Sequence, residues 1–425
     1  MPAVEFSQIT DLKRQAVEKK VREFFENNNP GMKAFGKQVE KGPLTEKGVR
    51  LPDYAQRPTG ETWYSPAQSD FNAAIGPQTA SMWVYPTMYA YPMLWTGSAI
   101  ESMEVDTADN VNSYEDIMAQ YSAAANKRLE QYFFRNGNGA LAYSASTISS
   151  LGSNSLTGST TWGGSPGYTK GTSYLWQGAQ FQAINASTNQ VRGSFTVTTA
   201  GSTSCTINLT SGTISSGDPI VAVGAWQMAM RGLDWLISPT NRVLQGLDTS
   251  VYTDLNAPGV DLGGALLTPA AIENAKTLAQ TRNNNADAKN NWTAFITFGQ
   301  WSTIRKQGYN FSYYVRNQEN SDTMKGVQGD YTDGDTRFIC AADQDDCTVH
   351  FAATSEMKMY EMKPFGPYSF DKQEWRMLLG ANSTGSDVYQ KAIGWKGNPG
   401  VISPRATSYI WDAQLPFATS VSAGI

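Results

Sequence analysis

The chain holds one pattern for nucleophilic catalysis. Residues 163–167 read Gly-Gly-Ser-Pro-Gly and match GxSxG, in which a strand-to-helix turn exposes a nucleophilic serine. Ser165 would need a histidine base, and the chain has a single histidine, His350. The residues around Ser165 are a Ser, Thr and Gly tract, and His350 lies in a strand pattern that predicts a structural role. A serine hydrolase built on these two residues is the least favoured hypothesis, and we expect no enzymatic activity.

Two acidic clusters contain the oxygen ligands that calcium prefers. Neither has the twelve-residue loop with a terminal glutamate that an EF-hand requires, so we predict solvated loops in both places. Residues 136–139 (NGNG) lack the strand–turn–helix context of a phosphate-binding loop, and the sequence therefore predicts no metal and no cofactor. The clusters consist of Asp330, Asp333 and Asp335, and of Asp343, Asp345 and Asp346.

Composition and charge exclude several classes of protein. The 425 residues carry a formal net charge of −5, which gives no bulk attraction to nucleic acid. No apolar run of about eighteen residues is present, and the charged start MPAVEFSQITDLKRQ differs from a signal peptide, so we expect a cytoplasmic protein without membrane contact. The three cysteines, Cys205, Cys340 and Cys347, form no CxxC unit, which argues against a disulfide framework or a zinc site.

The longest helix pattern spans residues 113–135. Its apolar side chains recur at spacings of three and four, which places them on one face of an α-helix. Asn112 or Ser113 can cap the first turn, and residues 136–139 are expected to stop the helix because Asn and Gly tolerate the left-handed conformation. The helix would be about 35 Å long at 1.5 Å per residue. With a single apolar stripe, it is predicted to lie across a sheet or another subunit.

The chain before this helix changes pattern twice. Residues 7–27 read as a charged helix with one apolar side. Residues 32–77 show no helical period, and long stretches of this kind are usually functional loops or linkers. Within them, residues 49–66 predict a two-stranded excursion that turns at residues 57–60. Such a hairpin has too little apolar surface to bury against itself and needs a partner surface.

Strand patterns lie on both sides of the long helix. Residues 81–100 are dense in aromatic residues and Met, and they predict strands packed under the helix. Residues 144–173 form a Ser/Thr/Gly tract that predicts a flexible surface loop. Residues 174–223 show short period-two segments joined by Gly, Ser and Asn turns, a pattern typical of a small β-barrel or sandwich inserted in the chain.

The remaining residues predict a mixture of helix and strand. Residues 268–282 (TPAAIENAKTLAQTR) predict a helix with Pro269 at its first position. Residues 292–298 predict a short buried strand, followed by a helix-like segment. Residues 330–346 are expected to be rich in loops, and the tail after Pro399 is expected to be irregular. Further strands are expected at residues 348–353, 357–362 and 375–395.

Taken in order, these segments resemble the major capsid proteins of tailed bacteriophages, the Hong Kong 97-type fold. The resemblance rests on an N-terminal arm, an extended loop, a long helix that ends in RNGNGALA, and an inserted β-module that closes with SGDPIVAVG. The phrases RGLDWLISP, LTPAAIENAKTLAQ and WTAFITFGQWSTIRKQGYNF are similar to the axial part of that family, and CTVHFAATSEMKMYEMKPFGPYSF is similar to its closing strands. The resemblance covers nearly the whole chain and contains no short invariant motif.

The resemblance implies an α+β fold of this type, with an arm, an extended loop, a long spine helix, peripheral and axial domains, and a small inserted β-barrel or sandwich module. The implied parts are an N-terminal arm (1–31), an extended loop (32–80), a peripheral domain (81–173) with spine helix 113–135, a β-module (174–223), an axial domain (224–345), and return strands of the peripheral domain with the C-terminal segment (346–425).

The resemblance also implies a structural function. Copies of the chain would self-assemble as hexamers and pentamers into the icosahedral shell around a viral double-stranded DNA genome, in a virion assembled in the host cytoplasm. Its partners would be itself, packaged DNA contacted without sequence specificity, and scaffolding, portal and decoration proteins where the virus has them. A phage tail or surface-adhesion protein is the alternative, but it would show repeats or fibrous periodicity, and the sequence shows neither.

An arm and a loop that cannot bury their own aromatic residues would be stabilised on adjacent copies, by about 25 cal/mol per Å² of apolar surface. Assembly would then be linked to the folding of these parts. The candidate inter-subunit contacts are Phe24, Phe25, Tyr54, Trp63 and Tyr64.

Overall fold

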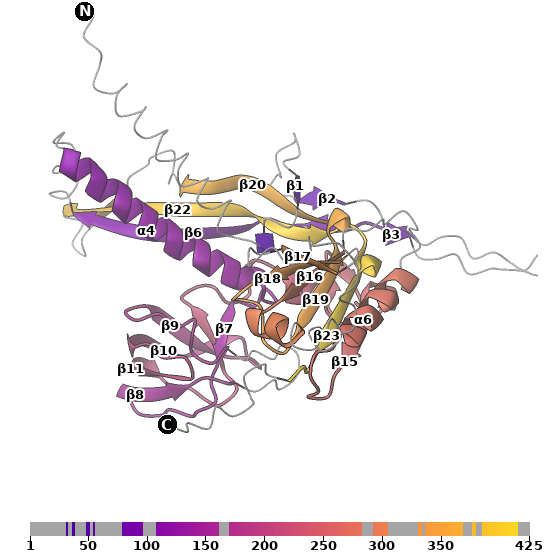
Figure 1. The fold of residues 1–425 in the computed structure, drawn as a ribbon. Helices are drawn as coiled ribbons and strands as arrows, with labels where there is room; N and C mark the ends of the chain where they lie inside the picture. Colours follow the sequence, from indigo (N-terminus) through magenta and orange to yellow (C-terminus); the bar gives the residue numbers. More distant parts are fainter. Residues whose placement is uncertain are drawn as a thin grey trace, which may run out of the picture.

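Three sheets and one long helix organise the molecule (Figure 1). The computed structural model describes residues 31–32, 36–38, 48–51, 54–55, 79–96, 108–160, 170–282, 292–304, 330–333, 336–368, 376–379 and 385–414. The helix predicted for residues 7–27 lies outside these ranges, as does the GxSxG stretch at residues 163–167.

The long helix, α4, spans Ala108–Phe133 and is 26 residues long. It therefore begins five residues before the predicted start, and the capping role assigned to Asn112 or Ser113 is wrong. The intrinsic cost of Asn or Ser inside a helix is at most about 0.7 kcal/mol, which is too small to fix a boundary by itself. The predicted stop is confirmed: Gly137 and Gly139 adopt positive φ angles of 82° and 85°, and a Cβ added at Gly139 would lie 2.2 Å from the Ala225 carbonyl oxygen.

The first sheet, which we call the long sheet, lies against α4. Its central strand, β22 (Gly385–Val401), pairs antiparallel with β6 (Thr87–Thr96) on one side and β20 (Met357–Tyr368) on the other. The rings of Tyr91 on β6 and Tyr121 on α4 meet edge to face at 6.1 Å, so the prediction that these aromatic strands pack under the helix is confirmed. Two short strands complete the sheet, β1 (Gly36–Gln38) next to β20 and β21 (Arg376–Leu379) next to β22.

The second sheet is antiparallel and nearly closes on itself; we call it the barrel. Its edge strands are joined by the Ser144–Gly158 bridge and by Ser159 N–H, which donates to the Tyr143 carbonyl at 2.8 Å. Phe181 and Phe195 meet in its core with ring centroids 6.0 Å apart. The strand order is β7 (Ala140–Tyr143), β12 (Pro219–Ala222), β9 (Gln180–Asn185), β10 (Gln190–Thr199), β11 (Ser204–Gly212) and β8 (Gly152–Thr157).

The barrel starts earlier in the chain than predicted. Its strands at residues 181–184, 191–199, 204–209 and 219–222 match the predicted segments, but β7 and β8 lie before the predicted boundary at residue 174. The prediction of a flexible loop over residues 144–173 is wrong where β8 runs. Ser and Gly dominate β8, so its composition resembles a loop, yet Leu156 points into the core and is 1% exposed.

The third sheet, which we call the mixed sheet, packs against helix α6 (Pro269–Arg282). The helix begins as predicted, with Thr268 Oγ1 accepting from the Ala271 N–H at 3.2 Å. Residues 298–304 form a further helix directly after β16. The strand order is β15 (Gly259–Asp261), β23 (Thr407–Trp411), β19 (Val349–Ala353), β16 (Trp292–Ile296), β18 (Thr336–Cys340) and β17 (Asp330–Asp333).

Two predictions for the last hundred residues are wrong. Residues 330–333 and 336–340 form the antiparallel pair β17 and β18, where loops were expected, and residues 407–411 form a strand in the tail that was expected to be irregular. The mixed sheet also crosses the predicted boundary between residues 345 and 346, because β19 and β23 pair within it. These strands pair with partners that are far away in the sequence, and local sequence patterns do not predict such pairing.

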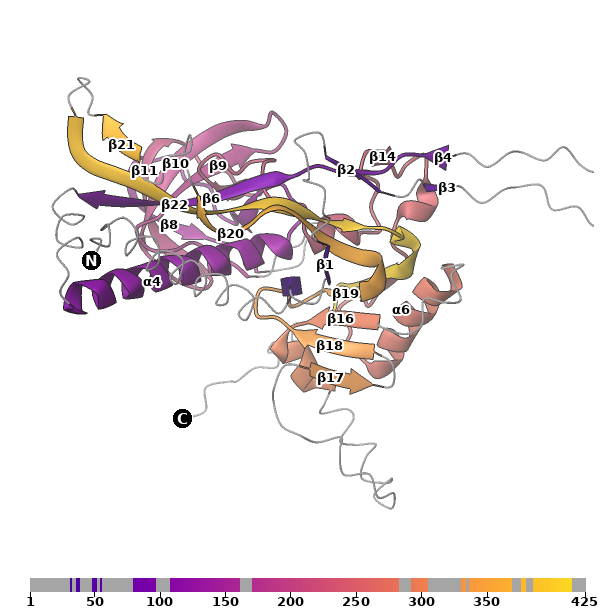
Figure 2. The same ribbon diagram turned by 90° about the horizontal axis from the view of Figure 1, so that it is seen from above.

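The predicted extended loop is anchored on its own subunit at its inner end. Strand β1 pairs with β20, and Met32 and Leu51 are buried. Beyond these anchors run two short ladders, which Figure 2 shows reaching the edge of the molecule. The first pairs β2 (Val49–Arg50) with β5 (Trp83–Val84), and the second pairs β3 (Tyr54–Ala55) with β4 (Thr79–Ala80). The two-stranded excursion predicted within residues 49–66 is therefore wrong, because Val49 pairs with Val84 and Tyr54 with Ala80, both partners lying beyond residue 66.

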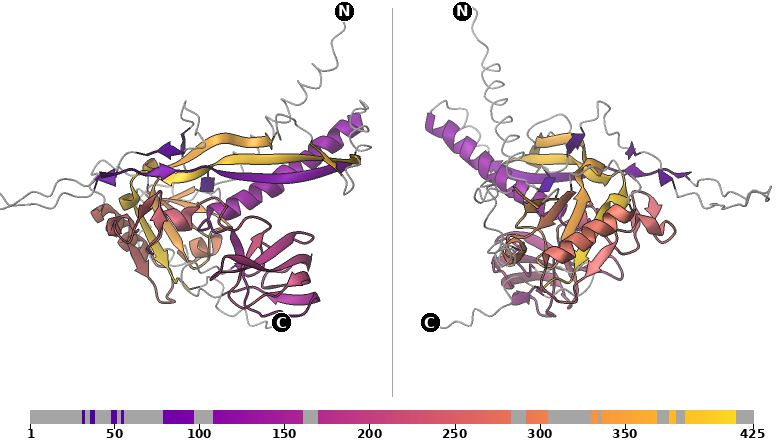
Figure 3. Two further views of the ribbon diagram at one scale, coloured as in Figure 1. Left: turned by 180° about the vertical axis from the view of Figure 1, so that it is seen from behind. Right: turned by 45° about the vertical axis from the view of Figure 1, so that its right-hand side comes forward.

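Figures 1 and 3 show the barrel and the mixed sheet side by side beneath the long sheet, with the C-terminal half of α4 between them. The residues of this half are buried almost all round, including the polar Asn126, Arg128, Glu130 and Gln131. The prediction of a single apolar stripe is therefore wrong for this part of the helix.

Candidate functional site

The loop of residues 341–348 joins β18 to β19 and carries three aspartates that were predicted to be solvated. Asp343 and Asp345 are instead 2% and 4% exposed. Their basic partners come from α4 and the residues just after it, and from the segment before β9, 176 to 216 residues away in the sequence. We call these pairs the charged joint: Lys127 Nζ lies 2.6 Å from Asp343 Oδ2, Arg135 Nη1 lies 3.4 Å from Asp345 Oδ2, and Lys170 Nζ lies 2.8 Å from Asp346 Oδ2.

The charged joint connects the mixed sheet, the C-terminal end of α4 and the barrel. Its aspartates lie in the loop between β18 and β19 of the mixed sheet, Lys127 lies in α4, and Arg135 lies two residues after the end of α4. Lys170 lies in the connection between the barrel strands β8 and β9. Tyr174, in the same connection between β8 and β9, donates its hydroxyl to the Asp343 carbonyl at 3.2 Å. Arg135 and Asp345 are both buried, and a buried pair of this kind loses about 3–5 kcal/mol when one partner is removed, whereas the Lys127 side chain is 46% exposed and contributes less. The joint therefore fixes the barrel and the mixed sheet against the same end of α4.

Two arginines, Arg128 in α4 and Arg135 just after its end, also stack on aromatic rings. The Arg128 guanidinium lies 4.0 Å from the centroid of the Trp176 ring and donates to the Tyr174 carbonyl at 2.9 Å. The Arg135 guanidinium lies 5.1 Å from the centroid of the Tyr174 ring. Burial lowers the pKa of Arg128 and raises the pKa of Tyr174 well above its ordinary value. Both contacts hold the barrel to the helix by cation–π attraction as well as by hydrogen bonds.

Glu130 is the one carboxylate of the described helix end that burial makes hard to ionise. It is 6% exposed, and burial, reinforced by the nearby Asp343 carboxylate, raises its pKa to about 7, while Lys127 opposes the shift. In the unfolded chain the same group has a pKa near 4.5. Glu130 is therefore largely neutral in the folded subunit at slightly acidic pH.

We expect the Glu130→Gln variant to remove a pH-dependent loss of stability. Because the folded pKa is raised, the advantage of neutral Glu130 is full below about pH 4.5 and is lost as the pH rises through about 7. The total loss is about 3 kcal/mol in the free energy of unfolding, from about 1.36 kcal/mol per pH unit. Urea unfolding of unassembled subunits at pH 4.5 and pH 8 should give matching stabilities for both proteins at the lower pH and a more stable variant at the higher pH. Parallel pH profiles would contradict the assignment.

His350 is held on both ring nitrogens. Its Nε2 lies 2.8 Å from Asp234 Oδ1, its Nδ1 lies 3.0 Å from Gln344 Nε2, and the residue is 1% exposed. A general base needs a free nitrogen within reach of the nucleophile, and this arrangement leaves none. His350 thus connects β19 to helix α5 (Leu233–Leu236), which agrees with the structural role predicted for it from the sequence. Ser165 lies outside the described residues.

The described residues offer few features for cofactor or redox chemistry. They contain no group of three or more His, Cys, Asp or Glu side chains placed to hold a metal ion. None of the three cysteines forms a disulfide bond, and burial raises the pKa of the Cys205 thiol to about 11 and that of Cys347 to about 12. In the part of the chain that the structure covers, no helix is long and apolar enough to cross a membrane.

The surface presents apolar side chains suited to contact with other molecules. Among them, Met228 is 71% exposed and Val251 is 68% exposed. Of the five predicted contact residues, Tyr54 lies in β3, whereas Phe24, Phe25, Trp63 and Tyr64 lie outside the described residues. The exposed large apolar side chains are Tyr85, Met88, Leu151, Val191, Val223, Met228, Val243, Val251, Leu266, Leu278 and Phe298.

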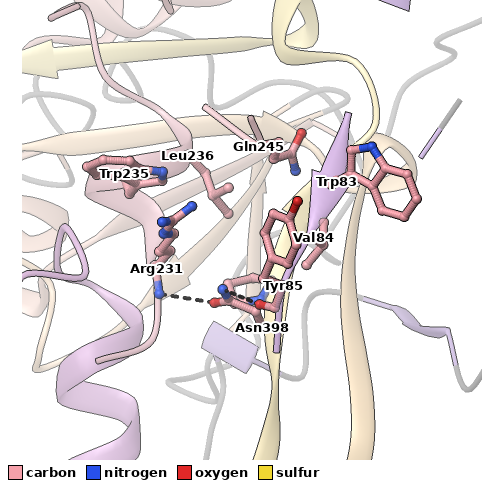
Figure 4. A pocket seen from close by; sticks show the side chains of 9 residues that line it. Trp83, Val84, Tyr85, Arg231, Trp235, Leu236, Gln245 and Asn398 are labelled. Carbon is pink, nitrogen blue, oxygen red and sulfur yellow. Dashed lines mark hydrogen bonds between the residues drawn. The ribbon is translucent and has the colours of Figure 1, made fainter. Parts of the chain in front are cut away.

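A small pocket lies where β5, β22 and the segment around α5 meet (Figure 4). The volume open to a water-sized sphere is about 10 Å³, which is room for about one water molecule and far below the roughly 300–1,000 Å³ usual for small-molecule sites. Asn398 braces it by accepting from the Arg231 N–H at 3.0 Å and donating to the Tyr85 carbonyl at 3.0 Å. The pocket is lined by Trp83, Val84, Tyr85, Arg231, Trp235, Leu236, Gln245, Asn398 and Pro399.

No sequence pattern predicts the pocket or the charged joint. Arg231 and Gln245 lie in segments without a recognisable motif, and the three basic partners of the joint look like ordinary surface charges. The alternation of apolar and polar residues in the sequence predicts where strands form, but it does not predict which strands pair with each other.

Comparison with known proteins gives a match by structure alone. No family model matches the chain, and no curated protein matches it. A chain from the capsid asymmetric unit of cyanophage A-1(L) is 8% identical and aligns over 91% of this chain and 93% of that chain, with a TM-score of 0.51. Matches to Mycobacterium phage Bobi (8% identity, 90% of each chain, TM-score 0.41) and to the virus-like particle from Pyrococcus furiosus (6% identity, 93% of this chain and 98% of that chain, TM-score 0.38) are weaker. The chain therefore has the mixed helix-and-sheet fold of a phage capsid protein, as the sequence resemblance predicted.

Proposed function

We propose that this chain is a major capsid protein, whose copies assemble into the icosahedral shell that encloses a double-stranded DNA genome. The observation that carries the proposal is the alignment with a cyanophage capsid chain over almost the full length of both chains. A match over 91% of this chain and 93% of that chain is too extensive to rest on one common motif. The role is structural, and the paired nitrogens of His350 fit a protein without hydrolytic chemistry.

Two features of the subunit support the proposed assembly: a rigid central part and short two-stranded ladders that need outside support. The charged joint holds the barrel, the mixed sheet and α4 as one unit, which suits a building block that must repeat the same contacts many times. The ladders β2–β5 and β3–β4 are only two strands wide, and such ladders are marginally stable alone. Their stability would come from adjacent copies, with Tyr54 and the predicted contacts Phe24, Phe25, Trp63 and Tyr64 at those interfaces.

The finer features of the shell follow from the same proposal. The subunits would form hexamers and pentamers, assembled in the host cytoplasm, and the barrel would lie on the outer surface as a spike or a clamp. The net charge of −5 suits a container that holds DNA without binding its phosphates tightly. Scaffolding, portal and decoration proteins are the partners that such a shell would use.

We expect purified recombinant protein to form shells, capsomer rings or tubes in negative-stain electron microscopy. Assembly depends on mass action, so the assembled fraction should rise with subunit concentration. Sedimentation velocity at several concentrations measures this fraction directly. A protein that stays monomeric at high concentration would contradict the proposal. The phage tail or adhesion alternative would instead give fibres or small closed oligomers.

A further inference from the structure

The outer surface of the barrel carries an apolar patch beside faces that are polar. Val191, Val223 and Met228 are 51%, 59% and 71% exposed, and Trp226, between the last two in the chain, is half-buried. The exposed side chains of β8 and β11 are instead Ser, Thr and Asn. Exposed apolar side chains that gather in one place mark an interaction site. We call Val191, Val223, Trp226 and Met228 the barrel patch.

Local contacts hold the two parts of the barrel patch together. Val191 on β10 lies opposite Ile184 on β9, and Trp226 packs against the small apolar cluster that contains Ile184. Asn189 Oδ1 accepts from the Trp226 indole N–H at 3.3 Å and from the Gln227 amide N–H at 3.1 Å. Asn189 and Gln227 both adopt left-handed backbone, with φ angles of 58° and 59°. Such backbone is strained at a residue other than glycine, and it persists where the surroundings fix it, often at binding sites. The patch is therefore preformed.

The N-terminal arm supplies a segment that matches the barrel patch. The sequence predicts that residues 7–27 form a charged helix whose one apolar side carries Val17, Val21, Phe24 and Phe25. Amphipathic helices bind by laying such a side on an apolar surface, through residues spaced like Val17, Val21 and Phe24. The two stretches that carry the patch, 179–191 and 219–230, contain no charged residue. The apolar side of the helix could therefore cover the patch without removing a charge from water.

The arm joins the described subunit on the side that carries the barrel patch. A Cβ added at Gly31 would lie 2.8 Å from Phe134 Cζ, so the arm is rooted at the end of α4, which lies over the barrel (Figure 1). The segment 223–232 packs on the same end of the helix, since a Cβ added at Gly232 would lie 2.1 Å from the Phe133 carbonyl oxygen. The predicted apolar side of the arm ends six residues before Gly31, and six residues span at most about 20 Å. The arm and the patch can therefore meet between adjacent subunits.

We propose that the barrel patch binds the apolar side of the arm, residues 7–27, of a neighbouring copy. The proposal rests on the proposed shell function, in which identical copies surround each subunit. Pro30 disfavours helical backbone at Asn29, and an extended connection there lengthens the reach of the arm beyond its own subunit. Each copy then contributes one arm and receives one, so the contact is heterologous and repeats around a ring of copies.

A pair of substitutions tests the contact from both sides. Because Met228 is 71% exposed, the unassembled Met228→Ser subunit should melt at the wild-type temperature. We expect Met228→Ser and Phe25→Ser each to lower the assembled fraction in sedimentation about tenfold, as loss of a central contact residue does. The double variant should assemble as well as either single variant, because both changes remove one contact. Met228→Leu, which keeps an apolar side chain, should assemble normally. Unchanged assembly of Met228→Ser, or effects of the two changes that multiply, would overturn the proposal.

A crosslinking experiment identifies the occupant of the barrel patch. The photoreactive residue p-benzoylphenylalanine is placed at Met228 in otherwise wild-type protein, and particles assembled from isotope-labelled and unlabelled subunits are irradiated and digested for mass spectrometry. We expect crosslinks to a peptide from residues 7–27 of a different copy. The same residue at Val251, which is 68% exposed and lies outside the barrel, should give no crosslink to that peptide. Crosslinks from Met228 only within one chain, to another segment or to another protein would refute the inference while leaving the shell function intact. A wild-type chain that forms no assembly would contradict both proposals.

Discussion

Replacing residues 56–78 with a short Gly-Ser linker is expected to give a folded subunit that no longer forms closed particles. These residues connect β3 to β4, and the ladders that lead to them have two paired residues on each strand. So few paired residues cannot stabilise these ladders in an isolated subunit. In the proposed shell, a neighbouring copy would supply the missing contacts. Circular dichroism and thermal melting should match the wild type, whereas electron microscopy should show no closed shells.

The boundaries of this replacement follow from the structure. A deletion of residues 38–70 would remove β2 and Leu51, which is 3% exposed and donates its N–H to the Met82 carbonyl at 2.9 Å. Such a deletion would damage the core and confuse misfolding with failed assembly. A matched control replaces residues 56–78 with a scrambled sequence of the same length and composition, which should also fail. Normal shells from either variant would show that this segment makes no assembly contact.

Arg135→Ala is expected to lower the free energy of unfolding of the unassembled subunit by about 3–5 kcal/mol. The side chains of Arg135 and Asp345 are 1% and 5% exposed, so removal of the guanidinium leaves a carboxylate buried without its counter-charge. Asp343 and Asp346, in the same loop, add like charge nearby. The variant also loses the contact with the Tyr174 ring. Urea unfolding monitored by tryptophan fluorescence measures the change.

A double variant separates charge from packing. With Arg135→Met and Asp345→Leu together, no buried charge is left unpaired, and most of the lost stability should return. A single variant within about 1 kcal/mol of the wild type would place this pair in the class of exposed ion pairs, which contribute little. Electron microscopy of the single variant adds a second readout, since a loosened joint should broaden the distribution of particle sizes.

The local parts of the fold were predictable from the sequence. The stop of α4 was predictable because Gly137 and Gly139 act through their own backbone angles. The start of α6 was predictable because Thr268 and Pro269 cap the helix within one turn. The barrel strands were predictable where Phe195 and Val197 alternate with polar residues, since one face of each strand is buried.

Long-range pairing was not predictable in the same way. Strand β23 is short and follows a proline-rich turn, and nothing local shows that it pairs with strands at residues 259–261 and 349–353. The same limit applies to the charged joint, because Asp343 and Asp345 have the composition of a solvated loop and their burial depends on partners more than 200 residues away. The pocket was hidden for the same reason: Gln245 and Arg231 meet only after β5 and β22 have formed.

The place of β23 in the mixed sheet sets the order in which the subunit can be made. This strand lies between β15 and β19, so residues 259–261 have no strand beside them until residues 407–411 have left the ribosome. Some 150 residues of nascent chain must therefore emerge before that sheet is continuous, and contacts of such long range form late in folding. A partly synthesised chain thus has no finished body to offer a growing shell, which limits incorporation to polypeptides translated past residue 411.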